Sequence, residues 1–327
     1  LYAGIRLNAE KFLNDVEADA FTQDTALPAL QQVYELWGAQ SGKLPTLSAI
    51  PSPRVYLKTY LAPIRTSIKI GTGIFSGRIP YAWLSGILSN NGNKLLHHFA
   101  NNQQLRGYVF NTKNNSGLTE LPTTYSTNKG TVYVGAAKIN MPTLWRTTLD
   151  IEININTLNK IGINWMYYQN LSEIGFSNIN LNPLQKQMEG FDSRWIQSPD
   201  HPMNIPLLPD GSNPYNEIIL IKNMGNQNGY GYSAGMYWVR QQKQYRWLMN
   251  YSYSNAFSMY DGNFSIPLNH WKLNEQINGR NNPAMAVSDF SRGHHIYAEY
   301  QVHAKTLKQK QLNYSIHYTG QSGSPFS

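Results

Sequence analysis

The chain has 327 residues and a formal net charge of +8, and its composition is unlike that of a helical enzyme. Charged residues make up 14%, against ~25% in an average soluble domain, whereas aromatic residues reach 13% and asparagine occurs 35 times. A hydrophobic share of 41% excludes a disordered chain. The absence of cysteine excludes disulfides, thiolate metal sites and cysteine nucleophiles.

No run of 18 or more apolar residues occurs, so the sequence contains no candidate transmembrane helix. Membrane β-barrel strands alternate and stay compatible with this pattern. The 27 basic residues are dispersed, which argues against binding to nucleic acid. The chain begins at Leu1 without methionine or a visible signal peptide, and we expect it to be a mature or internal fragment of a longer protein.

Residues 1–63 are predicted to form a loop region with one short helix over 27–37. Pro28 would occupy the first helical turn and Gly38 would end the helix. The apolar residues at helical spacing are Leu27, Leu30, Val33, Tyr34 and Trp37. The abrupt change of pattern between Tyr60 and Ile64 is a candidate join between two segments.

From residue 64 the hydrophobic period changes to two, which predicts strands. The predicted strands are 68–74, Gly130–Lys138, Leu149–Asn156, Ile161–Tyr168, Tyr230–Val239, Trp247–Ser254, Ile296–His303 and Leu312–Thr319. The last six form three hairpins with short turns. Residues 85–128, 169–225 and 255–291 are rich in Asn, Gly and Ser and are interpreted as long polar loops.

The sorting of connections by length indicates the architecture. Turns of three to six residues alternate with loops of roughly thirty to sixty, as in outer-membrane barrels with short periplasmic turns and long extracellular loops. We therefore predict an all-β chain that forms part of a large antiparallel transmembrane β-barrel over residues 64–327. A soluble β-sandwich is the alternative, because alternation alone does not say what covers the apolar face.

Six stretches within roughly residues 64–327 carry distinctive motifs. They are Ile70–Trp83 (IGTGIFSGRIPYAW), Met141–Leu149 (MPTLWRTTL), Tyr167–Asn170 (YYQN), Ser258–Gly262 (SMYDG), Asn278–Pro283 with Ser288–His294 (NGRNNP, SDFSRGH), and Tyr318–Ser327 (YTGQSGSPFS). In this order, they resemble segments of the Oar-like (OmpA-related) TonB-dependent outer-membrane receptors of Bacteroidetes-type bacteria. None of these segments is decisive alone, and their specificity lies in the combination.

The resemblance implies a barrel of about 22 strands, a location in the bacterial outer membrane and no enzymatic activity. Cargo such as a peptide, glycan or polypeptide would be captured at extracellular loops and passed through a plug-gated barrel. The implied partners are outer-membrane lipid, TonB acting through a segment absent here, and a surface lipoprotein or other outer-membrane complex subunits. The plug and the N-terminal β-sandwich of the family are not recognisable in this chain.

The strand faces give two predicted sets of residues. The predicted lipid-facing residues are Leu149, Ile151, Ile153, Ile155, Trp238, Trp247, Met249, Tyr251, Tyr300, Tyr314 and Ile316. The predicted lumen-facing residues are Asp150, Glu152, Asn154, Asn250 and Glu299. Paired carboxylates such as Asp150 and Glu152 can perform acid–base chemistry, but lining a lumen is the simpler interpretation.

The loop around residue 280 is the densest polar cluster and the predicted cargo contact. The predicted ligand-binding residues are Tyr260, Trp271, Asn278, Arg280, Asn281, Asn282, Asp289 and Arg292. Turn formation is the alternative role for Asn-Gly and Asn-Pro here. We expect no metal or cofactor, because the adjacent pairs His97–His98 and His294–His295 would point to opposite faces of a strand.

Two other functions stay open. A surface adhesion or structural protein would use the same loops as its working surface without transport. A soluble carbohydrate-binding β-sandwich would instead bury Leu149, Ile151, Ile153 and Ile155 against a second sheet.

Overall fold

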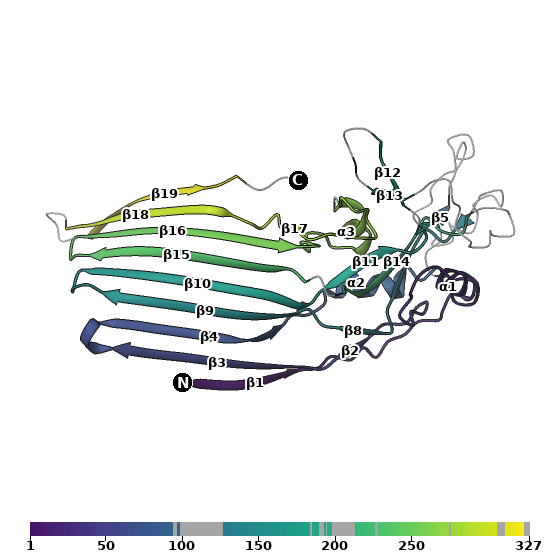
Figure 1. Ribbon diagram of the computed structural model, residues 1–327, viewed down its shortest axis with the longest axis horizontal. Coiled ribbons are helices and arrows are strands. Elements are labelled where there is room, and N and C mark those ends of the chain that lie inside the picture. The colour runs from purple at the N-terminus through teal and green to yellow at the C-terminus, as the bar shows by residue number, and fades with distance from the viewer. Residues whose placement is uncertain are drawn as a thin grey trace, which may run out of the picture.

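The computed structural model describes residues 1–93, 97–98, 127–183, 185–189, 193, 195–197, 213–225, 228–274, 276–305 and 311–323. These residues form a long antiparallel sheet and, at one end of it, a separate folded body that we call the head (Figure 1). No helix in the described part of the chain is long and apolar enough to cross a membrane.

The large sheet has ten strands among the described residues, in the order β1-β3-β4-β9-β10-β15-β16-β18-β19, with the short β17 beside β16. Their bounds are β1 Tyr2–Asn8, β3 Ile50–Leu61, β4 Thr66–Ser76, β9 Thr143–Asn154, β10 Asn159–Ser172, β15 Tyr230–Gln241, β16 Tyr245–Ser258, β17 Ala286–Val287, β18 Gly293–Lys305 and β19 Gln311–Gln321. All neighbours are antiparallel. The prediction of an antiparallel all-β chain is confirmed at this level.

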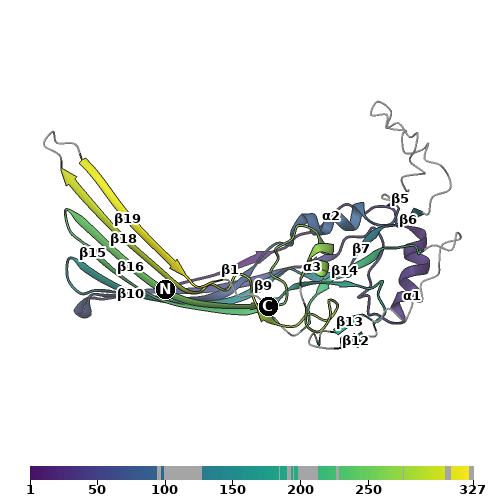
Figure 2. The same cartoon turned by 90° about the horizontal axis from the view of Figure 1, so that it is seen from above.

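The connections are sorted by length between the two ends of the sheet. The links β3–β4, β9–β10 and β15–β16 lie at one end, where β18 ends and β19 begins. The strand ends joined by the links β1–β3, β4–β9, β10–β15 and β16–β18 lie at the end that carries the head (Figure 1). Figure 2 shows that the sheet is bent, with β16 to β19 rising out of the plane of the other strands. All three predicted hairpins are present in the expected pairing.

One face of the large sheet is apolar across its width. Ile151 of β9 lies opposite Ile68 of β4 and Ile163 of β10, and Met236 of β15 lies opposite Ile163 and Tyr251. Directly paired residues of antiparallel strands share a face, so these cross-strand rows are continuous. Aromatic contacts flank the aliphatic rows at both ends, among them Trp247–Tyr300 (4.2 Å between ring centroids) and Tyr230–Phe257 (4.8 Å).

The opposite face of the sheet is polar and laced with ion pairs. Lys69 binds Asp150 (Nζ–Oδ1, 2.9 Å), Lys160 binds Glu152 (2.9 Å), and Arg246 lies 3.7 Å from Glu299. The Tyr237 hydroxyl donates to Glu152 (2.8 Å). Its ring lies directly over Gly162, where an added Cβ would come within 2.1 Å of the ring carbon Cζ. Glycine at this position therefore lets a tyrosine reach across strand β10.

The long connections do not stay as loops but fold together into the head. A three-stranded sheet lies at its centre, with β14 antiparallel to β11 and parallel to β7. The elements of the head are η1 Thr22–Ala26, α1 Leu27–Gln31, β2 Thr46–Ser48, α2 Tyr81–Ser89, β5 His97–His98, β6 Thr127–Asn128, β7 Thr131–Gly135, β8 Lys138–Asn140, β11 Ile174–Asn178, β12 Gln185–Gln187, β13 Trp195–Gln197, β14 Glu217–Asn223 and α3 Pro267–Leu273. The 3-10 turn η2, Ala62–Ile64, joins β3 to β4.

The hydrophobic core lies in the head. Every fully buried apolar side chain in the described part of the chain comes from a connection, and none comes from a strand of the large sheet. Two hydrophobic clusters lie on opposite faces of the three-stranded sheet. Successive side chains from Ile218 to Ile221 of β14 belong alternately to one cluster and to the other. Leu84 of α2 and Trp271 of α3 pack into the first cluster, and Leu30 of α1 packs into the second.

The prediction that residues 1–63 form a loop region is wrong, because β1 and β3 belong to the large sheet. Strand β3 includes two prolines, Pro51 and Pro53. They lie where β3 pairs with β1 only, before the β4 register begins at Arg54, so the missing N–H groups cost no bond to β4. The candidate join at Tyr60–Ile64 is also wrong, since β3 and β4 form a continuous hairpin there.

The helix predicted over 27–37 lies earlier in the chain and ends at Gln31. Asp19 caps its start, because the Asp19 carboxylate accepts the Thr22 N–H (2.8 Å). The polar segments interpreted as loops contain β11, β14, α3 and the second half of α2. The predicted strand 130–138 divides into β7 and β8 of the head. Residues 94–96 and 99–126 of the first segment lie outside the described residues.

Candidate functional site

The residues predicted to face lipid all lie on the apolar face, apart from Ile155, which follows the last residue of β9. Register pairs them in rows, such as Leu149 with Trp165, Ile153 with Ile161, and Trp238 with Met249. The further pairs are Trp247 with Tyr300, Tyr300 with Ile316, and Tyr314 with Val302. No described element packs over them as a second sheet would; the three-stranded sheet lies beyond the end of the strands (Figures 1 and 2).

The residues predicted to face a lumen share the polar face. Asp150 and Glu152 form the ion pairs described above, and Glu299 is buried beside Arg246 and accepts hydrogen bonds from Tyr297 and Gln301. The remaining two, Asn154 and Asn250, have the same strand parity. His294 and His295 lie on opposite faces, opposite Tyr253 and Ser252 respectively, as expected for neighbours on a strand.

Two of the residues predicted to bind ligand instead build the core of the head. Trp271 is 6% exposed and packs in the first cluster. The Tyr260 hydroxyl donates to the Phe176 carbonyl (3.0 Å), and the two rings meet edge to face. Burial raises the pKa of Tyr260. The Trp271 ring is therefore not free to stack on a sugar or a peptide side chain, and the prediction of ligand contact is wrong for this residue. The Tyr260 hydroxyl is engaged with the core.

Asn281 is a structural crosslink rather than a free amide. Its Oδ1 accepts from the Trp271 indole (2.8 Å) and from the Asn178 N–H (2.8 Å), and its Nδ2 donates to the Asn178 carbonyl (2.7 Å). Arg280 is exposed and its guanidinium lies 5.5 Å from the Trp271 ring centroid. Asn278 and Asn282 are exposed on the same loop. This loop is therefore held rigidly against β11.

Asp289 and Arg292 lie apart from this loop, where β16 and β18 meet the head. Both side chains are exposed. The Asp261 carboxylate organises this turn, because it accepts from the Ser288 hydroxyl (2.6 Å), the Asp289 N–H (2.8 Å) and the Ser258 hydroxyl. The predicted ligand-binding residues thus divide between two places, and the Asn278–Pro283 loop borders a cleft.

A cleft of about 730 Å³ opens in the head beside the Asn278–Pro283 loop. This volume lies in the range of small-molecule sites. Its lining comes from four separate connections and consists of Trp37, Ala136, Lys138, Asn140, Ser177, Lys222, Asn223, Met224, Gly225, Met259, Asn281, Asn282 and Pro283. Two lysines and no acidic residue occur among the described residues that line it.

Two asparagine bridges fix the walls of the cleft. Asn223 at the end of β14 accepts the Asn140 N–H (2.7 Å) and donates to the Asn140 carbonyl (2.9 Å) and the Ser172 hydroxyl (3.1 Å). Asn281 holds the opposite wall through Asn178. Both amides are engaged with other protein groups, so they shape the cleft and leave little capacity for a ligand.

The positive charge of the cleft is centred on Lys222. Its side chain is half-buried, and no described residue forms an ion pair or a side-chain hydrogen bond with its ammonium group. Burial lowers the pKa of Lys222, and the more distant charge of Glu35 offsets this only in part. Lys138, on β8, is exposed. A partly dehydrated cation without a close counterion favours an anion that would restore its lost solvation.

Trp37 borders the cleft in an unusual conformation. Its φ is +54°, a region that bulky residues rarely occupy, and Gly38 follows with φ +70°. The Trp37 carbonyl accepts the Ala137 N–H (2.9 Å), which helps to hold this turn, and half of the side chain is exposed. Strained residues of this kind concentrate at binding and catalytic sites.

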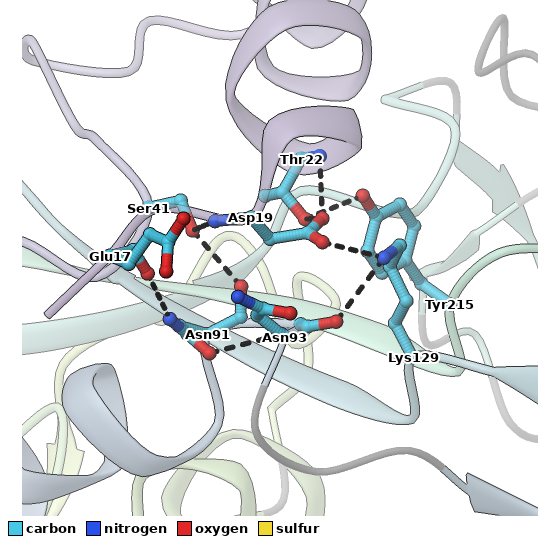
Figure 3. Close-up of polar contacts among 9 residues, drawn as sticks. Glu17, Asp19, Thr22, Ser41, Asn91, Asn93, Lys129 and Tyr215 are labelled. Atoms are coloured by element: carbon cyan, nitrogen blue, oxygen red, sulfur yellow. Dashed lines mark hydrogen bonds and ion pairs between the residues drawn. The ribbon is translucent and has the colours of Figure 1, made fainter.

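A buried polar network ties three long connections of the head together (Figure 3). Asp19 binds Lys129 (Oδ1–Nζ, 2.7 Å) and accepts from the Thr22 hydroxyl (2.6 Å), which in turn accepts from Tyr215 (2.8 Å). The Lys129 ammonium also donates to the Gly92 carbonyl (3.2 Å). All polar groups in this network are engaged, so its role is structural.

A second set of ionisable groups lies near the junction between the sheet and the head. His270 stacks on Phe176 (4.9 Å between ring centroids) and its Nε2 lies 2.6 Å from the Phe264 carbonyl. Burial lowers the pKa of His270 and raises that of Glu173. Within the described residues, no three His, Asp or Glu side chains come together as they would around a metal ion.

Sequence reasoning found Asn281 and Asn282 of the cleft but missed Lys222, Lys138 and Trp37. The run Glu217–Asn223 carries four consecutive aliphatic residues, which is the signal of a strand buried on both faces. That signal would have placed Lys222 at the end of a buried strand. No local pattern indicates that Trp37 would meet it, because the two residues belong to different connections.

Comparison of the sequence with known proteins gives no matching family model and no curated protein of significant similarity. Function is therefore inferred from the geometry and from the resemblance of the motifs.

Proposed function

We propose that this chain is part of a TonB-dependent outer-membrane receptor, in which the sheet is barrel wall and the head captures cargo. The observation that carries the proposal is the continuous apolar face of the sheet, which holds none of the buried core. At about 3.4 Å per residue, β9 with 12 residues is long enough to cross a bilayer core even when tilted.

The other features of the sheet agree with this function. The opposite face carries Lys69–Asp150, Lys160–Glu152 and Arg246–Glu299, which suits a wet lumen or contact with a plug. Aromatic side chains at both ends of the aliphatic rows suit the two membrane interfaces. The head lies at the end with long connections, which is the extracellular end in such barrels. The open edges of the sheet would require closure by further strands.

Single-cysteine labelling tests which face meets lipid, and the label reacts at one site only because the chain has no native cysteine. An environment-sensitive fluorophore is attached to the apolar face in the variants Ile151→Cys and Ile163→Cys. It is attached to the polar face of the same strands in Thr148→Cys and Asn164→Cys. In vesicles with brominated lipid, we expect strong quenching at 151 and 163 and weak quenching at 148 and 164. Iodide in the aqueous phase should show the reverse. Equal lipid quenching on the two faces would refute the proposal.

An outer-membrane adhesin without transport is the second candidate, and the independent core of the head favours it. Such a head could hold a partner without any movement of the sheet. Cells producing the full-length protein distinguish the two, with and without functional TonB. Import that stops without TonB while surface binding persists supports the receptor. Surface binding with no import in either strain supports the adhesin.

A further inference from the structure

We propose that the head cleft binds a small peptide-like acid, with its carboxylate at Lys222 and Lys138 and its apolar body against Trp37 and Met224. This inference deepens the proposed function by naming the class of cargo, and it rests on that function only for what happens after binding.

The charge pattern of the cleft selects an anion. Lys222 and Lys138 both line the cavity, and the described lining contains no carboxylate that would compete with a ligand for them. Lys222 is half-buried and lacks a bound counterion among the described residues. An arriving carboxylate therefore gains a charged hydrogen bond without displacing an existing one.

The absence of two other features makes carboxylate a better fit than phosphate. Arginine is over-represented where a phosphate is held by two parallel hydrogen bonds, and helix N-termini also bind phosphate. The described lining of the cleft contains no arginine, and its residues come from strands and loops. A carboxylate carries a single negative charge, which suits the half-buried ammonium group of Lys222 together with the exposed ammonium group of Lys138.

The remaining lining favours an apolar ligand body over a sugar. A sugar ring needs several side-chain hydrogen-bonding groups, but two of the four asparagine amides in the lining, those of Asn223 and Asn281, are already engaged with protein groups. Met224 and the exposed Trp37 ring provide apolar surface, and the methionine can adapt to different side chains. A hydrophobic dipeptide with a free C-terminal carboxylate combines these properties, and the cavity volume accommodates it.

Calorimetric titration of the full chain in detergent micelles tests the proposal. The probes are N-acetyl-leucyl-phenylalanine, its C-terminal amide, glucuronate and inorganic phosphate. We expect the peptide acid to bind at least about tenfold more tightly than the amide, because the amide lacks the charged contact. Lys222→Met should abolish this preference and Lys222→Arg should retain it. Lys138→Met should weaken it, and Lys43→Met, at an exposed lysine outside the cleft, should leave it unchanged.

Three results would overturn the inference. They are equal binding of the acid and the amide, tighter binding of glucuronate or phosphate than of the peptide acid, or an intact preference in both Lys222→Met and Lys138→Met. The fluorophore quenching described above separates this failure from failure of the proposed function. If the peptide acid does not bind but the quenching pattern is as expected, only the proposed ligand class is refuted. If the peptide acid binds but the two faces are quenched equally, the proposed receptor function is refuted.

Discussion

At the scale of single residues, burial in the head lowers the pKa of two basic groups. Lys222 and His270 both have lowered pKa values with burial as the main cause. Their roles differ because their surroundings differ. Lys222 opens onto a cleft, whereas His270 is enclosed between Phe176, Trp83 and the Phe264 carbonyl. The first is placed to meet a ligand, and the second is placed to hold α3 against the core.

His270 should make the stability of the head depend on pH. Its folded pKa lies below the unfolded value of 6.5, so the unfolded state binds more protons between the two values and stability falls as pH decreases through this range. We expect the free energy of unfolding, measured by denaturant titration in detergent, to fall between pH 7 and pH 5. His270→Gln should show a flatter dependence over the same range. An equal slope in the variant would show that other groups cause it.

At the scale of elements, the alternating strands were the predictable part. Leu149–Asn156 shows every second residue aliphatic, and β9 forms with the expected pairing. The elements of the head escaped prediction for a physical reason. Strand β14 is covered on both faces, so Ile218–Ile221 shows no alternation, and its surroundings are rich in Asn and Gly. Tyr81–Ser89 and Pro267–Leu273 are short helices that tertiary packing stabilises rather than local propensity.

Glycine in the polar face is a second element-scale feature, and it predicts a position-specific effect. Gly162→Ala should destabilise the sheet by about 1–3 kcal/mol, because the new Cβ meets the Tyr237 ring and displaces it from Glu152. Gly4→Ala is the matched control on β1, since no atom lies within 4 Å of its Cβ position. Denaturant titration in micelles compares the two. A loss of equal size in both variants would mean that strand propensity, and not the Tyr237 contact, controls stability.

At the scale of the whole molecule, the protein has two parts. The large sheet contributes no side chain to the buried apolar core, and the head contains that core around a sheet of three short strands. The sequence motifs predicted where strands pair, since pairing follows local patterns. The assembly of the head required contacts between connections that are far apart in sequence, such as Thr22 with Tyr215 and Asn281 with Asn178. Such contacts leave no pattern within any one segment. The sequence therefore did not predict that Trp37 and Lys222 line the same cleft.

The Asp19–Lys129 pair should control the head as a unit. Asp19→Asn leaves the Lys129 ammonium buried and unpaired, so we expect a loss of about 3–5 kcal/mol in the stability of the head. Hydrogen exchange should accelerate in α1 and β7, whereas β9 and β10 should exchange as before. Asp150→Asn breaks an ion pair whose side chains are 38% and 32% exposed, and should cost less than about 1 kcal/mol. Losses of similar size in Asp19→Asn and Asp150→Asn would contradict the expectation that the buried ion pair of the head matters more than the exposed ion pair of the sheet.

The strand count of the large sheet has a consequence for how it can be extended. Eight antiparallel steps separate β1 from β19, so the two outermost strands run in the same direction. They cannot become antiparallel neighbours by curling the sheet until its edges meet. A ring in which every neighbour is antiparallel therefore needs an odd number of additional strands between them. Parity thus sets a rule for whatever pairs with these two edges.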